Sequence, residues 1–342
     1  MDSAAVEAQL APYLVQPSKL PAWPSLTEAP PKGKNIYYVS TGSGTAAIIG
    51  SAIKAACDAL GWTYHPLTFN GSNPASANSA LLTAVGSGAD GVIMTGRPKA
   101  SIMSGLDAAK TKGVEIVQTQ GTDSPGTPGF DQVGNTPSNA AQTAKVIALG
   151  IVADAATAGA TAHVGVVTTS GIPAIQGYSD ATLAAIKGVC PSCSADSIDV
   201  PVADLLSGQA AKSVVSFIQR HPETNYVHVV AGAVEGGLRQ ALDAAGLTKV
   251  EITGYAPTPA QNQAVKDGKD LFYVQSPSGY YGWIAIDTIA RHLTGGNASI
   301  HNAEADPVWL VNKTNLEFDP NVLPDFPAGY QEQLKKLWGP AS

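Results

Sequence analysis

The sequence predicts an α/β protein with two doubly wound, Rossmann-like domains, each built around a parallel sheet. The chain has 342 residues, which suits two domains of ordinary size. Short apolar segments alternate with helical segments of about 10–20 residues, which is typical of a parallel sheet flanked by helices. The pattern runs from about 35 to 119 and starts again at about 137, so one unit follows another of similar length.

The first half begins with a Pro-rich arm over 1–32, where we expect one short helix at 4–14. Prolines lack the N–H group that helices and sheets need, so the rest of the arm is expected to be irregular. Apolar segments then predict strands, and amphipathic segments predict the helices between them. The strands are expected at 35–40, 63–69, 91–94 and 115–119, and the helices at 45–60, 75–87 and 100–112.

The second half repeats this alternation after a long helix at 137–158. Strands are expected at 162–168, 197–202, 226–231, 251–255 and 271–275, and helices at 173–188, 203–220, 234–245, 258–267 and 279–293. A last strand at 307–312 precedes a Pro-rich tail, which ends in a short helix at 330–338.

Composition argues against two classes of partner. Charged residues make up 14% of the chain and the net charge is −7, without a basic stripe, so nucleic acid is not expected to bind. No apolar run is long enough to span a bilayer. Residues 1–14 lack the basic and apolar regions of a signal peptide, so no signal segment is visible.

The three cysteines indicate a local disulfide. Cys57 falls in a predicted helix and is expected to be a small buried side chain. Cys190 and Cys193 form a Cys-Pro-Ser-Cys segment that follows a helix and precedes a strand, unlike a redox motif, which opens a helix. We expect these two to be bonded, which would indicate an oxidising compartment. Free thiols, or a metal or redox pair, remain the alternatives.

Several segments resemble a known family. They are IYYVSTGSGTAAIIGSAIKAACDALGW, GADGVIMTGRPKA, VGNTPSNAAQTAKVIALGI, TSGIPAIQGYSDA and, as the most specific, GYAPTPAQNQAVKDGKDLFYVQSPSGYYGWIAIDTIARHL. Over about 33–315 the chain resembles the periplasmic binding proteins of type 1, the ribose- and galactose-binding-like receptors of ABC importers. The arm and the tail resemble an actinobacterial branch.

The resemblance implies a three-segment hinge, with crossings near 134–137, 276–278 and 311–315. Domain 1 would comprise 33–135 plus 277–311, and domain 2 would comprise 136–276 plus 312–342. A ligand would bind in a cleft between the domains, at the carboxyl ends of the strands, and hinge closure would bury it. The resemblance also implies an extracytoplasmic, lipid-anchored monomer that serves a membrane permease of an ABC transporter.

Loops at the strand ends and positions near the hinge supply the candidate ligand contacts. Amide groups suit such a site because they can donate to and accept from hydroxyl groups. Arg97 is expected to meet an acidic or hydroxylated group of the ligand, or to cap a helix. The candidates are Ser43, Thr45, Arg97, Gln120, Asn135, Gln176, Tyr178, Tyr255 and Gln275.

The chain departs from the sugar-binding members of that family at their charged positions. Their Asp-Arg pair after the fourth strand corresponds to Gln120 and Gly121, their arginine in the loop that opens domain 2 to Gln176, and their aspartate in Gly-Phe-Asp to Ala256. Only Gln275 matches cleanly. Because charge-assisted hydrogen bonds are the strong ones, their loss predicts a neutral small molecule, with a sugar or polyol favoured. An aromatic or steroid-like compound is the alternative.

Other functions fit less well. Residues 42–47 match a dinucleotide-binding Gly-x-Gly-x-x-Ala pattern, but no acidic residue ends the second strand. No catalytic motif is present and the six histidines are scattered, so we expect no enzyme activity, no cofactor and no metal. The ligand-sensing domain of a regulator remains as another class, although the arm is too Pro-rich for a helix-turn-helix.

Overall fold

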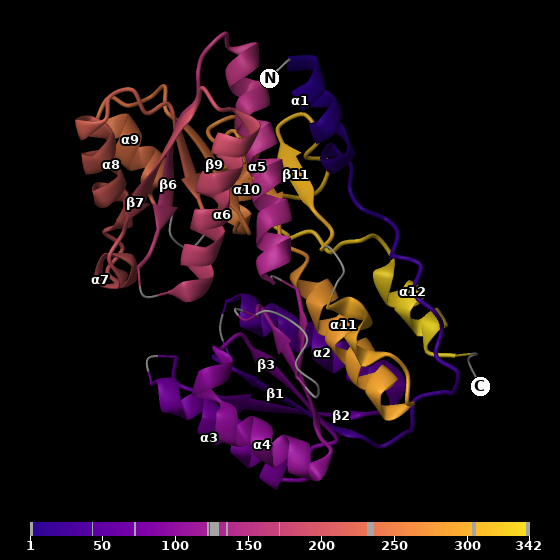
Figure 1. The fold of residues 1–342 in the computed structure, drawn as a ribbon. Helices are drawn as coiled ribbons and strands as arrows, with labels where there is room; N and C mark the ends of the chain where they lie inside the picture. Colours follow the sequence, from indigo (N-terminus) through magenta and orange to yellow (C-terminus); the bar gives the residue numbers. More distant parts are fainter. Residues whose placement is uncertain are drawn as a thin grey trace. The chain divides into compact units, whose positions relative to one another are not determined.

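Two α/β units, each with its own parallel sheet, make up the chain in the computed structural model (Figure 1). The first-sheet unit comprises residues 17–139, 277–307 and 325–342, and the second-sheet unit comprises 1–16, 140–276 and 308–324. The structure describes residues 3–42, 44–71, 73–121, 123, 130–134, 136–170, 172–230, 236–302 and 306–339.

The first sheet has the strand order β2-β1-β3-β4-β5, and all its strands are parallel. The strands are β1 (Asn35–Ser40), β2 (Thr63–Thr68), β3 (Gly91–Thr95), β4 (Glu115–Thr119) and β5 (Phe130–Val133). Strand β3 is mainly apolar, and both β3 and β4 are almost wholly buried, as expected for a sheet covered on both faces. Pro66 lies in β2, where its missing N–H is tolerated because β2 is an edge strand.

Helices cover both faces of the first sheet. Helix α2 (Thr45–Leu60) packs against α11 (Ser278–Leu293), where a side chain on Gly282 would lie 2.8 Å from the carbonyl oxygen of Ile49. Helices α3 (Pro74–Gly86) and α4 (Met103–Lys112) pack together and bury a second apolar cluster with β1, β3 and β4. The 3-10 turns η2 (Lys99–Ser101) and η4 (Ala298–His301) and helix α12 (Tyr330–Leu337) complete the unit.

The second sheet has the order β11-β10-β9-β8-β6-β7. The strands are β6 (His163–Thr168), β7 (Ser194–Asp199), β8 (Tyr226–Val229), β9 (Glu251–Tyr255), β10 (Phe272–Gln275) and β11 (Trp309–Asn312). The first five are parallel, whereas β11 runs antiparallel to β10 at the edge of the sheet. An antiparallel edge strand on a parallel sheet is common in doubly wound folds.

Two apolar clusters flank the second sheet. One joins α5 (Pro137–Thr157), α6 (Pro173–Val189) and α1 (Ser3–Leu10), which buries Val6 and Leu10 there. The other joins α8 (Ala210–Arg220), α9 (Leu238–Ala244) and α10 (Pro259–Lys266). Turn η1 (Ala11–Leu14) follows α1, and its Leu14 carbonyl accepts a hydrogen bond from Asn315 Nδ2 at 2.7 Å.

Three elements differ from the sequence prediction. Strand β5 was missed because its middle residues, Asp131 and Gln132, are polar; Asp131 is buried among donors from Ser299 and Asn302. The helix predicted at 203–220 is two helices, α7 (Val202–Leu206) and α8, because Gly208 between them has φ of 71°. Strand β7 begins at residue 194 rather than 197, directly after the disulfide that joins Cys190 and Cys193.

The two ends of the chain divide between the units. Residues 312–342 were assigned from the sequence to domain 2, whereas residues 325–342 pack with the first sheet. Trp338 stacks on Trp283 of α11 with ring centroids 5.5 Å apart, and Tyr330 packs edge-on against Tyr280 and Trp283. The arm also divides, since Val6 joins the second-sheet core and Trp23 joins the first.

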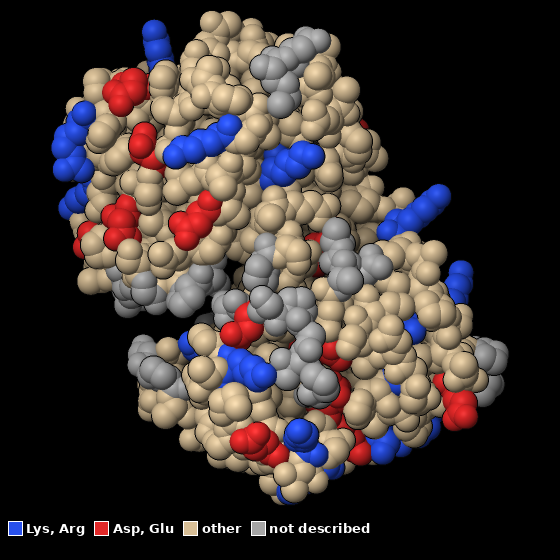
Figure 2. All heavy atoms as spheres, viewed as in Figure 1, with Lys and Arg blue, Asp and Glu red and all other residues tan. Residues whose placement is uncertain are grey.

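The surface is sparsely charged. In the view of Figure 2, Lys, Arg, Asp and Glu side chains are scattered over both units with the two signs interspersed. No helix in the described ranges combines the length and apolar character needed to cross a membrane.

Candidate ligand site

The carboxyl ends of the parallel strands are the natural place to look for a ligand in each unit. In open α/β sheets, ligands bind in the crevice outside these strand ends. The strand-end loops of the first sheet follow Ser40, Thr68, Thr95, Thr119 and Val133. Those of the second sheet follow Thr168, Asp199, Val229 and Tyr255, and β10 ends at Gln275.

Arg97 lies at the first-sheet edge, two residues after β3. Its guanidinium carbon is 4.6 Å from the centroid of the Phe69 ring. The electron-rich face of the ring attracts the cation. Burial lowers the pKa of Arg97. The Nε atom is buried and has no hydrogen-bond partner among the described residues. The cation is therefore partly dehydrated and held against an aromatic ring.

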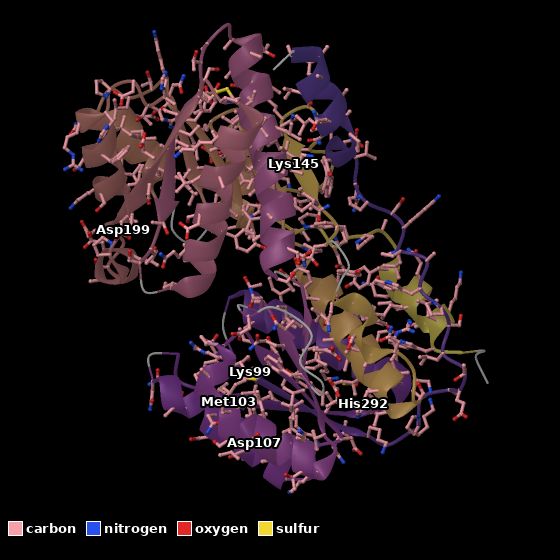
Figure 3. All side chains as sticks on the ribbon, viewed as in Figure 1. Lys99, Met103, Asp107, Lys145, Asp199 and His292 are labelled. Atoms are coloured by element: carbon pink, nitrogen blue, oxygen red, sulfur yellow. A yellow bond between two sulfur atoms is a disulfide. The ribbon has the colours of Figure 1, made fainter. Side chains whose placement is uncertain are left out.

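The backbone around Arg97 is fixed by its neighbours. Gln118, fully buried in β4, donates from Nε2 to the Arg97 carbonyl oxygen at 2.8 Å. A side chain on Gly96 would lie 1.8 Å from the carbonyl oxygen of Gln120, so the two loops touch through their backbones. Two residues further on, the Lys99 amide donates to Asp123 Oδ2 at 2.7 Å; Figure 3 labels Lys99 near the start of α4.

Two further predicted contacts are described at this edge, and two are not. Gln120 has φ of 59° and its amide donates to the Gly134 carbonyl at 3.1 Å, so its side chain is set by an unusual backbone. Thr45 is half-buried at the start of α2. Ser43 and Asn135 lie outside the described residues.

The second-sheet edge brings two predicted tyrosines together. Tyr178 of α6 stacks on Tyr255 at the end of β9, with ring centroids 4.9 Å apart and planes 12° apart. Both rings are more than nine-tenths buried. Gln176, two residues earlier on the same helix, is exposed.

Gln275 is buried at the end of β10 and reaches a residue that the sequence analysis did not name. Its Nε2 donates to Asn262 Oδ1 of α10 at 2.9 Å. The Nδ2 of Asn262 is buried without a partner among the described residues. Ser170, after β6, donates from its amide and hydroxyl to Asp199 at the end of β7, at 2.9 and 2.8 Å (Figure 3 labels Asp199).

Phe69, Asn262 and Asp199 are edge residues that the sequence analysis missed. Phe69 ends the strand predicted at 63–69, and this position was a signal open to sequence reasoning. Asp199 fell inside the strand predicted at 197–202, and its place at a strand end appears only in the structure. Asn262 lies mid-helix and meets Gln275 only through the fold, so no local pattern identifies it. Trp283 and Tyr280 of α11 pack in the first-sheet core with α12.

The ionisable cluster of the first-sheet unit lies away from the ligand edge. Glu115 begins β4, at the amino end of the sheet, and its Oε2 lies 3.0 Å from His292 Nδ1 near the end of α11 (Figure 3 labels His292). Burial, followed by the negative charge of Asp131, raises the pKa of Glu115 to about 8. Across the described part of the chain, no group of three or more His, Cys, Asp or Glu residues is arranged to hold a metal ion.

A family model described as a periplasmic binding protein domain matches residues 31–297 of the chain. The chain belongs to the periplasmic binding protein family. A search of curated proteins finds none that matches this chain in sequence.

Solved structures show that this periplasmic binding protein shares the fold of several solute-binding proteins. The 5-methylthioribose transporter solute-binding protein from Thermotoga lettingae has a TM-score of 0.71, with 15% identity over 90% of this chain and 99% of that one. GanP, a glucose-galactose binding protein from Geobacillus stearothermophilus, has a TM-score of 0.70 with 16% identity over 84% and 100% of the two chains. An ABC transporter solute-binding protein from Mycobacterium smegmatis with bound glycerol has a TM-score of 0.68 with 20% identity over 83% and 96%.

Proposed function

We propose that this chain is the extracytoplasmic solute-binding protein of an ABC importer and that its ligand is a small hydroxylated molecule, with a sugar or polyol favoured. The observation that carries the proposal is the family match over residues 31–297. The ligand class is supported by the similar solved structures, whose names refer to 5-methylthioribose, glucose and galactose, and glycerol. The chain would capture its ligand without any chemical step.

The ligand would bind between the two domains at the carboxyl edges of both sheets, and the domains would close over it by a hinge. The amides and aromatic rings at the two described edges support this proposal, because they suit the hydroxyl groups and the C–H faces of such a molecule. The proposed contacts remain Ser43, Thr45, Arg97, Gln120, Asn135, Gln176, Tyr178, Tyr255 and Gln275.

The proposed partner is the membrane permease of the transporter, which would receive the closed, liganded monomer. A location outside the cytoplasm is supported by the disulfide between Cys190 and Cys193, because such bonds persist in oxidising compartments. Lipid anchoring outside the cell would be in keeping with the same role.

A thermal-shift screen tests the ligand class. Ligand at a hundredfold over its dissociation constant adds about 2.7 kcal/mol to the free energy of unfolding, which is readily seen as a higher Tm. A panel of sugars and polyols is compared with a panel of aromatic and steroid-like compounds. A shift with a sugar or polyol supports the proposal. Shifts only in the second panel would keep the receptor and change its ligand class, which the stacked Tyr178 and Tyr255 would then serve.

Small-angle scattering tests the closure. With a ligand from the screen at saturation, the radius of gyration is expected to fall relative to the unliganded protein. An unchanged scattering curve with demonstrably bound ligand would contradict hinge closure while leaving the ligand class intact.

A further inference from the structure

Arg97 differs from the other arginines of the chain because it is half-buried and has no countercharge among the described residues. Arg291 pairs with Asp287 and Arg239 pairs with Asp243, and Arg220 is exposed on α8. Arg97 is half-buried, yet none of the carboxylates in the described residues lies within ion-pair distance of it.

Among the described residues, the surroundings of Arg97 hold the guanidinium in place and supply no countercharge to it. The ring of Phe69 covers one face of it, and Gln118 and Gly96 fix the backbone that carries it. Beside it, a side chain on Gly71 would lie 3.6 Å from Nη2, so the glycine places no side chain against that edge of the guanidinium. Such a group is organised before a ligand arrives, and little rotamer entropy is lost when one binds.

The positive charge of Arg97 determines which class of ligand the guanidinium can bind. A ligand at the strand ends would remove the water that still solvates the guanidinium. Neutral hydroxyl groups replace the hydrogen bonds of that water but supply no countercharge, and an unpaired charge taken out of water is strongly disfavoured. A planar acidic group, by contrast, offers two oxygens to the guanidinium fork and neutralises it.

We propose that Arg97 binds an acidic group of the ligand, so that the solute is a sugar acid rather than a neutral sugar. This inference rests on the proposed function and narrows its ligand class; it departs from the neutral ligand expected from the sequence. A carboxylate and a phosphate both offer paired anionic oxygens. The planar carboxylate is the closer match to the planar guanidinium of Arg97, which is half-buried and covered on one face by the Phe69 ring.

Matched ligand pairs test the proposal by isothermal titration calorimetry and thermal shift. D-galactose is compared with D-galacturonate, D-glucose with D-glucuronate, and sorbitol with D-gluconate, and D-glucose 6-phosphate serves as the phosphate arm. We expect at least one acid to bind about tenfold or more tightly than its neutral counterpart at low salt. Binding of the phosphate in preference to every carboxylate would overturn the assignment to a sugar acid.

Variants then assign the preference to this residue. Arg97→Gln is expected to lose about tenfold to a hundredfold in affinity for the acid and little for its neutral counterpart, whereas Arg97→Lys keeps the charge and retains an intermediate affinity. Arg220→Gln, which removes an exposed arginine of the second-sheet unit, is the matched control and is expected to bind as the wild type does. The Tm without ligand reports folding of each variant.

The outcomes separate this inference from the function on which it rests. If a neutral sugar or polyol binds as tightly as its acid, or if Arg97→Gln binds the acid unchanged, the role of Arg97 is wrong and the solute-receptor function stands. If no member of either set binds, both the acid preference and the sugar or polyol function are contradicted.

Discussion

Gly96 is the residue on which the position of Arg97 depends most directly. A Cβ there would lie 1.8 Å from a backbone oxygen of Gln120, and a backbone atom cannot rotate aside as a side chain can. We expect Gly96→Ala to lower the free energy of unfolding by about 1–3 kcal/mol, as overpacking does. Chemical denaturation of the variant and the wild type measures this change in the free energy of unfolding.

The matched control for that substitution is Gly86→Ala in the same unit. Gly86 ends α3 and has open space where a Cβ would point, so alanine is expected to be neutral or to add up to about 1 kcal/mol. Equal stabilities of the two variants would show that the contact between the loops is looser than the structure has it.

Glu115 gives the stability of the first-sheet unit a dependence on pH. Its pKa is raised from 4.5 to about 8 in the folded chain, so folding favours its protonated form. Its contribution to stability is therefore fully present below about pH 4.5 and is lost as the pH rises towards 8. We expect Glu115→Gln to be more stable than the wild type at pH 8.5, with a smaller difference at pH 5.

Denaturation midpoints of the two proteins across this pH range measure the effect. Glu332→Gln on α12 is the control, because that carboxylate is 71% exposed and is expected to change little between the two pH values. Parallel pH profiles of Glu115→Gln and the wild type would contradict the raised pKa.

At the scale of elements, Asp287 joins α11 to three other segments. It accepts hydrogen bonds from Arg291 Nε at 2.6 Å, His301 Nε2 at 2.7 Å and Trp338 Nε1 at 2.7 Å. Arg291 in turn donates to the Pro24 carbonyl at 3.0 Å, which ties in the arm. Burial opposes the charge on Asp287, but the bond from His301 and the nearby cations lower its pKa.

We expect Asp287→Asn to cost about 3–5 kcal/mol, because it leaves Arg291 buried without its countercharge. Asp58→Asn removes the partner of Lys54 from an exposed pair with the same helical spacing and is expected to cost less than about 1 kcal/mol. Equal shifts of the denaturation midpoint in Asp287→Asn and Asp58→Asn would contradict the larger contribution of the buried cluster to stability.

At the scale of the whole molecule, the chain returns to the first-sheet unit at its carboxyl end. Phe326, Tyr330, Leu334 and Trp338 are all buried there. Each such side chain contributes about 1.5–3 kcal/mol, and their sum approaches the stability of a whole domain. A chain that ends at Pro324 is therefore expected not to fold its first-sheet unit, as hydrogen exchange of that unit would show.

Val322 and Leu323 lie just before this segment and provide a control, since their side chains are 61% and 36% exposed. Serine at both positions is expected to leave the Tm nearly unchanged. Full protection of the first sheet in the truncated chain would mean that α12 is dispensable, in keeping with the assignment of 312–342 to domain 2.

Much of the architecture was predictable because each strand and helix carries a local signal. The apolar run of β3 and the glycine that ends α2 indicate their elements without reference to any other part of the chain. Strand β5 carries no such signal, because its polar Asp131 is satisfied by partners about 170 residues away. For the same reason, the partner of Gln275 was invisible until α10 was placed against β10.

The sequence by itself determined the two-unit α/β fold and the family, because periodicity and short motifs are local properties. It also located the strand-end loops, and with them Arg97. Only the tertiary structure decided that Arg97 lies on Phe69 without a carboxylate partner among the described residues, and that the tail packs with the first sheet. Burial and countercharge depend on contacts between segments that are distant in the sequence, and local sequence patterns do not reveal those contacts.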